Sequence, residues 1–166
     1  DEALWSTGKN QGTKPDPTDQ DAVEVAEKAD KFAFLTVNNK TYLYSVGAGK
    51  FVVKSETDGS KAHANMYYPT YSDRPAHDIS FLPATNGSWF PVVVKFNVDG
   101  PNQLNVSNSF SYPIIMWDDQ ADPGNQVRIE EAGNTYDLSS VIETIENYQS
   151  QEEALNEYLS WFKASY

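Results

Sequence analysis

The residues best suited to chemistry gather in one short stretch, PIIMWDDQADPGNQVRI, at positions 113–129. Trp117 offers a flat apolar surface, and the polar side chains around it can bond to hydroxyl groups. Carbohydrate recognition needs this combination, because the sugar ring stacks on an aromatic face while fixed donors and acceptors hold its hydroxyls. Together with Asn105, which precedes it, the stretch therefore predicts a sugar site, with candidate ligand-binding residues Asn105, Trp117, Asp118, Asp119, Asn125 and Gln126.

Two other interpretations of this stretch stay open. Asp118, Asp119 and Asp122 offer oxygen ligands that suit calcium, but they lack the Asp-x-Asp-x-Asp-Gly spacing of a specific calcium loop. The stretch can also be a structural turn built on Pro123 and Gly124, with the tryptophan packed inward. We assign no metal and no cofactor to the chain.

Histidines and carboxylates also meet in the stretch 63–78, which holds His63, His77, Asp73 and Asp78. Such groups can act as acid and base or bind zinc, but no third strong ligand or nucleophile motif accompanies them. The sequence holds no Gly-x-Ser-x-Gly, no His-Glu-x-x-His and no glycine-rich phosphate loop, since Lys50 lies in a hairpin pattern rather than before a helix. We therefore predict a protein that is not an enzyme.

The balance of charge excludes two classes of partner. The 166 residues carry 12 Lys and Arg against 24 Asp and Glu, and the net charge of -12 at pH 7 repels nucleic acid and anionic membrane surfaces. No run approaches the roughly 18 apolar residues that cross a bilayer, so we expect no membrane insertion. A hydrophobic content of 39% is enough to build one folded domain around a core.

We expect an exported protein, located outside the cell or in the cell envelope. The sequence starts at Asp1 and shows no leader, so either a leader has been removed or the chain is cut from a longer one. An acidic chain with many Tyr, Asn, Ser and Thr residues fits an exported protein. Cysteine is absent, which excludes disulfides and thiolate metal sites.

Three segments follow from the pattern of apolar residues. Residues 1–30 are rich in Gly, Pro and polar residues, and we expect a flexible N-terminal segment with a short helix over 22–29. Residues 31–133 hold short runs of Val, Tyr, Phe and Thr between turn signals, which predicts a β domain with a long loop or irregular edge at 63–78. The expected strands are Phe32–Val37, Thr41–Val46, Phe51–Ser55, Ile79–Leu82, Phe90–Val98, Leu104–Ser107, Ile114–Trp117 and Gln126–Glu130.

Residues 134–166 predict a C-terminal helical segment. Its apolar residues recur at helical spacing, at Val141, Ile145, Tyr148, Leu155, Leu159 and Phe162. Capping-box patterns at Ser140 with Glu143 and at Ser150 with Glu153 leave open whether this is one helix or two that meet near Ser150. The apolar stripe needs a partner surface, either the β domain or another chain.

Two stretches of the β region superpose, YLYSVGAGKFVV at 42–53 and VKFNVDGPNQLNV at 94–106. Each predicts a hairpin, with apolar residues alternating on one face and a Gly-containing turn between the strands. The matched pairs are Tyr44 with Phe96, Val46 with Val98, Phe51 with Leu104 and Val53 with Val106. A period near 50 residues indicates one supersecondary unit used at least twice.

The second copy and the residues after it resemble a repeat of the ricin B-type β-trefoil lectins. In that family a hairpin is followed by a strand that ends in an aromatic residue, a polar turn, and a Gln-x-Trp strand whose glutamine ties the turn in place. Trp117, Asn125 and Gln126 match these features. The resemblance covers about residues 31–133, and it implies a β-trefoil-like barrel, a non-catalytic carbohydrate-binding domain and a glycan as partner.

The sequence also departs from the family pattern. Arg128 stands where the family has its tryptophan. The acidic residue that binds sugar hydroxyls in the family falls on Asn105 in the second copy and on Val52 in the first, where an apolar side chain cannot bond to a hydroxyl. Only two repeats are recognisable, whereas a full trefoil has three.

A function from another class stays open, namely a structural or protein–protein interaction domain with no sugar site. Its docking surface would be the helical tail or the tyrosine-rich loop, with Tyr67, Tyr68, Tyr71, Trp89 and Phe90. An exposed Trp117 favours the glycan function. A buried Trp117, combined with an exposed stripe of apolar residues on the tail, favours the protein partner.

Overall fold

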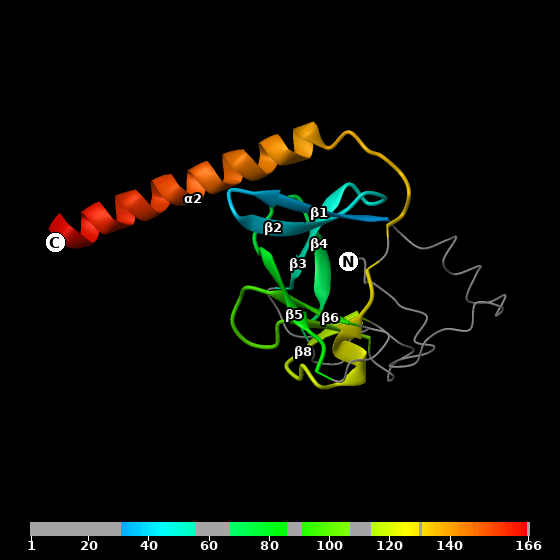
Figure 1. Ribbon diagram of the computed structural model, residues 1–166. Coiled ribbons are helices and arrows are strands. Elements are labelled where there is room, and N and C mark those ends of the chain that lie inside the picture. Colours follow the sequence, from blue (N-terminus) through cyan, green and yellow to red (C-terminus); the bar gives the residue numbers. More distant parts are fainter. Residues whose placement is uncertain (1–30, 56–66, 86–90, 107–113, 130, 166) are drawn as a thin grey trace, which may run out of the picture.

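The β region folds into nine strands of one antiparallel sheet in the computed structural model, which describes residues 31–55, 67–85, 91–106, 114–129 and 131–165 (Figure 1). The strands are β1 (Phe32–Val37), β2 (Lys40–Ser45), β3 (Lys50–Lys54), β4 (Pro69–Ser72), β5 (Ile79–Pro83), β6 (Val92–Phe96), β7 (Gln103–Val106), β8 (Ile114–Trp117) and β9 (Gln126–Val127). A short 3-10 helix, η1 (Pro123–Asn125), precedes β9, and the α-helix α2 (Ser139–Ser165) follows it. The protein is therefore mainly β, and its last element along the chain is one long α-helix.

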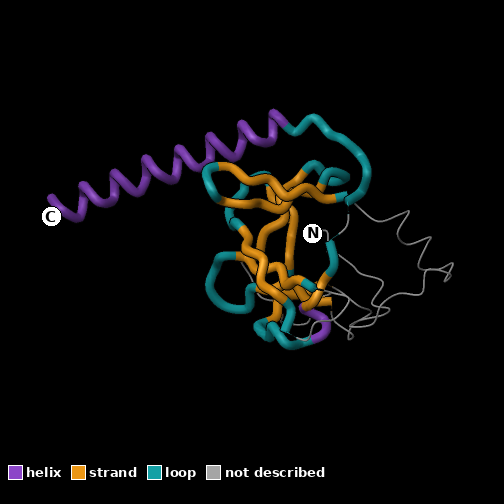
Figure 2. Tube along the Cα trace, in the orientation of Figure 1, coloured by secondary structure: helices purple, strands orange, loops and turns teal. Residues whose placement is uncertain are grey.

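The sheet curls until its two ends meet, which makes a nearly closed barrel (Figure 2). The strands follow the order β4-β3-β2-β5-β6-β7-β8, with β1 paired to β2 and β9 paired to β6. The backbone amide of Met116 in β8 donates a hydrogen bond of 2.8 Å to the carbonyl of Tyr67, which lies just before β4. This closure satisfies backbone groups that an open sheet would leave at its edges.

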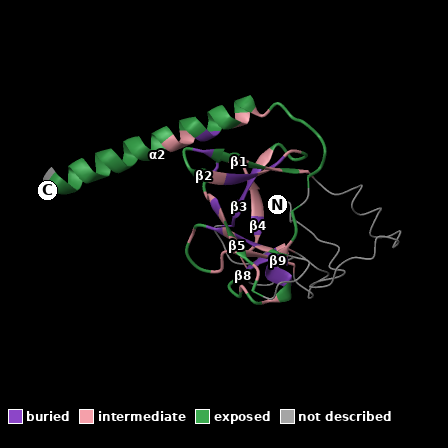
Figure 3. Cartoon of the chain, in the orientation of Figure 1, coloured by how far each residue is buried: buried purple, intermediate pink, exposed green. Residues whose placement is uncertain are grey.

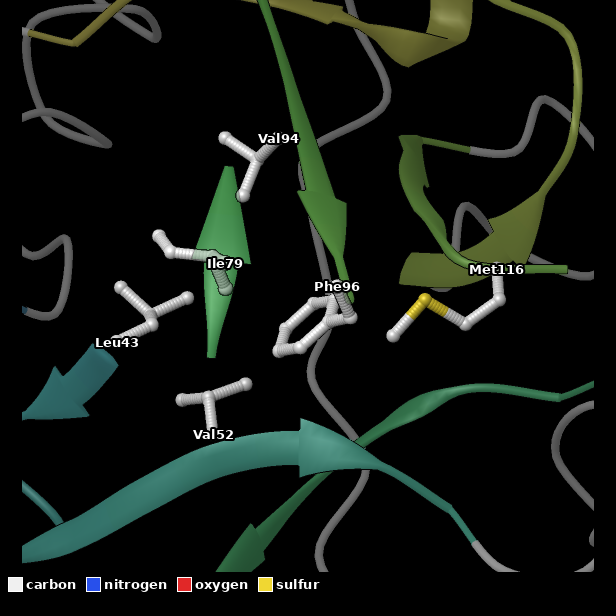
Figure 4. Close-up of a cluster of buried hydrophobic side chains, with 6 residues drawn as sticks. All are labelled: Leu43, Val52, Ile79, Val94, Phe96 and Met116. Atoms are coloured by element: carbon white, nitrogen blue, oxygen red, sulfur yellow. The ribbon is translucent and has the colours of Figure 1, made fainter. Parts of the chain in front are cut away.

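Side chains from five strands fill the interior of the barrel (Figure 4). Phe96 of β6 is 0% exposed and Met116 of β8 is 1% exposed. The complete buried cluster consists of Leu43, Val52, Ile79, Val94, Phe96 and Met116. Because successive side chains of a strand point to opposite faces, Met116 can enter the interior while its neighbours in β8 face outward.

A second buried cluster lies where the helix α2 packs on the barrel. Ile145 of α2 is 0% exposed, and it contacts a group made of Val37, Tyr42, Phe51 and Val53. Gln149 fixes this contact, because its side-chain amide donates to the carbonyl of Val37 at 3.0 Å and to the hydroxyl of Tyr42 at 2.9 Å. Along the first part of the helix, the predicted apolar stripe of the tail thus packs against the β domain.

The helical tail is one continuous helix of 27 residues, so the alternative of two helices meeting near Ser150 is not what the chain adopts. Beyond Ser150 the helix runs away from the barrel, and its surface there is exposed (Figure 3). Among the described residues, no helix combines the length and the apolar character needed to cross a bilayer.

Most predicted strands lie close to where the sequence places them. Phe32–Val37 and Ile114–Trp117 have the predicted bounds, whereas β9 ends at Val127 rather than at Glu130. Within the stretch 63–78, where a loop or an irregular edge is expected, the described part contains β4, which pairs with β3 at one end of the sheet order. The predicted N-terminal helix over 22–29 lies outside the described residues.

The two superposed stretches both form antiparallel hairpins, β2–β3 and β6–β7. Their turns contain Gly49 and Gly100, which have positive φ angles of 65° and 77°, a conformation that favours glycine. The matched residues reach different clusters, since Tyr44 packs against the cluster under α2 while its match Phe96 fills the barrel interior. Phe51 likewise lies in the cluster under α2, whereas its match Leu104 packs against the interior cluster.

Candidate functional site

The candidate site is a turn folded over the outer face of β7 and β8. In the register of these strands Gln103 lies opposite Trp117 and Asn105 lies opposite Ile115. Since Met116 points into the barrel, alternation turns Trp117 and Ile115 to the other face. The residues after Trp117 continue through η1 to β9, and η1 packs against β7.

Two buried asparagines hold this turn to the strands beneath it. Asn125 is 0% exposed and Asn105 is 5% exposed. The side-chain nitrogen of Asn105 donates to the side-chain oxygen of Asn125 at 2.6 Å. The nitrogen of Asn125 in turn donates to the side-chain oxygen of Gln103 at 2.9 Å and to the carbonyl of Trp117 at 3.2 Å. Both amide side chains are thus engaged inside the protein.

The three aspartates of the turn each accept a hydrogen bond from a different backbone amide. Asp118 accepts from Asn102 at 3.0 Å, and Asp119 accepts from Ala121 at 3.0 Å. Asp122 caps η1 by accepting from the amide of Gly124 at 2.7 Å. The carboxylates therefore organise separate parts of the turn, and among the described residues no group of three or more His, Cys, Asp or Glu side chains is placed to hold a metal ion.

Gln120 and Gln126 fasten the rest of the turn. The side-chain nitrogen of Gln120 donates to the carbonyl of Pro83 at 2.7 Å, which ties the turn to the end of β5. The side chain of Gln126 is buried and donates to the carbonyl of Ala121 at 3.5 Å, at the long limit of a hydrogen bond. Gln126 thus lies inside the turn rather than on its surface.

Of the six candidate residues, three remain at the surface. Trp117 is 43% exposed, and Asp118 and Asp119 next to it are also exposed. An ionised carboxylate has two oxygens and accepts several hydrogen bonds, so each aspartate can accept further bonds beyond the one it receives from the backbone. The surface combines an aromatic face with hydrogen-bond acceptors.

Lys54 interacts electrostatically with Asp118 of this surface, and its role is not evident from the sequence. Its ammonium group donates to the carbonyl of Asp99 at 2.7 Å and lies 4.1 Å from the centre of the Tyr67 ring. Burial lowers the pKa of Lys54, while the carboxylates of Asp118 and Asp99 act in the opposite direction. The one available signal is its position at the end of the apolar run Phe51–Val53, where a strand residue is expected to be partly buried.

The described side chains that were considered for catalysis each bond to a different partner. The ring nitrogen Nδ1 of His77 accepts a hydrogen bond of 3.1 Å from the backbone amide of Lys54. Asp73 pairs with Lys50, and Asp78 accepts from the side chain of Asn97 at 2.9 Å. His63 lies outside the described residues.

The tyrosine-rich loop is used at least partly for packing. Tyr67 and Tyr71 are half-buried against the core cluster of the barrel interior. Trp89 and Phe90, which the sequence groups with them, lie outside the described residues.

A polar groove of about 880 Å³ lies elsewhere, between the turn that joins β1 to β2 and the helix α2. Its walls include Lys40, Gln149, Glu152 and Glu153, and none of the described residues that line it is aromatic. A sugar ring would find no stacking surface there, which makes the surface at Trp117 the better candidate.

Comparison of the chain with protein-family models, with curated proteins and with solved structures finds no match.

Proposed function

We propose that this chain is a non-catalytic carbohydrate-binding domain that holds its ligand at Trp117, Asp118 and Asp119. The observation that carries the proposal is the 43% exposure of Trp117, a large aromatic side chain at the end of a strand that the buried asparagines hold in place. A rigid, exposed indole gives a sugar ring a stacking surface at little cost in entropy.

The polar groups beside the indole favour a neutral glycan. Carboxylates only accept hydrogen bonds when ionised, so Asp118 and Asp119 suit the hydroxyl donors of a neutral sugar. A sugar acid would meet like charge from these side chains and from a chain with a net charge of -12. We therefore infer neutral hexoses as the ligand class, in preference to sialylated or uronic-acid glycans.

Two finer statements belong to this proposal. We infer a β-trefoil-like arrangement for the barrel, supported by the two hairpins β2–β3 and β6–β7 at matched places in the sequence. We also infer an exported protein, supported by its acidic composition.

The test is a glycan-array screen of the parent chain beside two variants, Trp117→Ala and Trp161→Ala. Trp161 is the matched control, because it is also an exposed tryptophan, at 62%, but lies on α2. Circular dichroism checks that all three proteins fold. The proposal predicts binding of neutral glycans by the parent and by Trp161→Ala, and loss of at least about tenfold in affinity for Trp117→Ala. If the parent binds nothing on a broad array, or if both variants bind like the parent, the proposal is wrong.

A second candidate function is a protein-interaction domain. The observation that favours it is the exposure of apolar side chains at the far end of α2, where Leu155 is 57% and Tyr158 is 60% exposed.

A further inference from the structure

The last sixteen residues of α2, 150–165, form an outer half that extends beyond the barrel (Figures 1 and 3). Five large apolar or aromatic side chains are exposed there, Leu155, Tyr158, Leu159, Trp161 and Phe162, with exposed fractions of 43–62%. Exposed apolar groups that lie together mark interaction surfaces more often than scattered ones do.

Four of these residues lie on one face of the helix. Leu155, Tyr158, Leu159 and Phe162 follow the spacing i, i+3, i+4, i+7, which makes a continuous apolar stripe. We call these four residues the outer stripe. In the inner half of the helix, a similar spacing places Val141 and Ile145 against the barrel. The outer stripe repeats this apolar spacing, but its side chains are exposed rather than packed against the barrel.

We propose that a second copy of this chain covers the outer stripe, with the two helices antiparallel. The positions of two charged side chains, Glu152 and Lys163, favour this partner. Glu152 lies seven residues before Leu159 and Lys163 lies four residues after it, so both flank the stripe on the side of Leu159. Lys163 is also the one basic residue of α2, which is otherwise acidic.

An antiparallel pair uses these two flanking charges reciprocally. If the two-fold axis passes near Tyr158 and Leu159, Leu155 of one copy faces Phe162 of the second copy. Residues on the same flank meet across an antiparallel helix pair, so Glu152 comes beside Lys163 of the second copy. The two-fold axis repeats this ion pair on the other side, as an isologous interface requires.

The net charge of -12 on each copy opposes association, so the apolar stripe and the two ion pairs must outweigh this repulsion. Glu153 and Glu157 are four residues apart on the face opposite the outer stripe, so they point away from the second helix. The hydrogen bonds from Gln149 to the barrel lie before residue 150, and the paired segments span about residues 152–165. The polar groove beside the β1–β2 turn extends along α2 to Ser160, and Glu152 also lines it. Asn156 and Ser160 of this groove lie on the side of the helix away from the outer stripe, so the second helix approaches from another side than the turn.

The test is sedimentation equilibrium of the full chain over a range of concentrations. We expect a reversible dimer with a dissociation constant on the order of micromolar. Glu152→Lys or Lys163→Glu alone should weaken the dimer by about tenfold, and the double variant, which exchanges the two charges, should return to within about threefold of the parent.

Glu157→Lys is the matched control, because it changes the net charge as Glu152→Lys does but lies on the opposite face. The dimer constant of Glu157→Lys should not weaken. A parent that stays monomeric up to roughly millimolar concentration would overturn the proposal, and would leave the outer stripe to a partner of another sequence. It would also fail if Glu152→Lys and Glu157→Lys behaved alike, or if the exchanged pair did not recover. The result is independent of sugar binding at Trp117.

Discussion

The side chains of Asn105 and Asn125 are twenty positions apart in the sequence and share a hydrogen bond of 2.6 Å beneath the turn that carries Trp117. This bond joins β7 to η1. Asn125 also donates to the backbone carbonyl of Trp117, so the backbone that carries the indole is held in place. The buried amide pair is therefore the structural basis of the candidate site, and the exposed residues beside it form the surface that a ligand would meet.

Replacing Asn125 with alanine should destabilise the protein. The change leaves the side chains of Asn105 and Gln103 and the carbonyl of Trp117 without their common partner. Because a buried polar group that loses its partner costs about 1–3 kcal/mol, and only the bond to Asn105 is fully buried, we expect a loss of about 2 kcal/mol in the free energy of unfolding. Urea denaturation measures it, with Asn134→Ala as control, since Asn134 is exposed. A loss below about 0.5 kcal/mol for Asn125→Ala would contradict the buried network.

The docking of α2 includes one fully buried side chain, and its removal should be costly. Ile145 is 0% exposed in the cluster under the helix, whereas Ile142 in the same helix is 36% exposed. We expect Ile145→Ala to lower the free energy of unfolding by about 2–4 kcal/mol, and Ile142→Ala by less than about 1 kcal/mol. Thermal and urea denaturation compare the two variants. Equal losses would mean that the helix does not dock on the barrel through Ile145.

Much of the fold follows from the sequence, because local patterns determine it. Alternation places β1 and β8 at their predicted bounds, and helical spacing predicts α2. β4 is less evident, since Pro69 and the tyrosines around it obscure the alternation and pairing with β3 defines the strand. The apolar pattern of α2 is similar along its length, so the sequence does not say which half the barrel covers.

The candidate site is predicted only in part, for a reason that lies in strand register. The residue types in one stretch are enough to predict the candidate residues Trp117, Asp118 and Asp119. The bonding of Asn105 to Asn125, and the contribution of Gln103, depend on which residues of β7 lie opposite β8. A single sequence does not fix that register, and it does not show that the ammonium group of Lys54 reaches the carbonyl of Asp99.

A glycine beside Lys54 should tolerate alanine poorly. Gly100 has a φ of 77°, and a Cβ atom there would lie 2.9 Å from the ammonium nitrogen of Lys54. Gly133 has the same φ with nothing within 4 Å, so it isolates the backbone strain. We expect Gly133→Ala to cost about 1 kcal/mol and Gly100→Ala about 1 kcal/mol more, because Lys54 must move from its bond to Asp99. Urea denaturation measures both losses, and equal losses in the free energy of unfolding for the two variants would refute the close contact.

The burial of Lys54 also predicts a dependence of stability on pH. Its pKa is lowered from 10.5 by burial, with Asp118 and Asp99 opposing the shift. The folded protein then releases this proton at a lower pH than the unfolded chain does. Between the two pKa values the unfolded chain binds more protons, so the free energy of unfolding rises with pH. The penalty from Lys54 is complete below the lowered pKa and disappears above 10.5.

The measurement compares the parent with Lys54→Met by urea denaturation from about pH 7 to about pH 11. Other titrating groups are common to both proteins, so the difference isolates Lys54. The free energy of unfolding of the parent should rise relative to that of the variant as the pH increases. A difference that stays constant with pH, or that changes in the opposite direction, would show that burial does not lower this pKa.

The most direct test of the sugar site follows the indole N–H signals of the parent chain by NMR during titration with a neutral glycan taken from the array screen. The chain has four tryptophans, and Trp117→Ala and Trp161→Ala identify the signals of those two. We predict that the Trp117 signal shifts in a saturable way while the Trp161 signal stays in place. A glycan that binds without moving the Trp117 signal would contradict the assignment of the site.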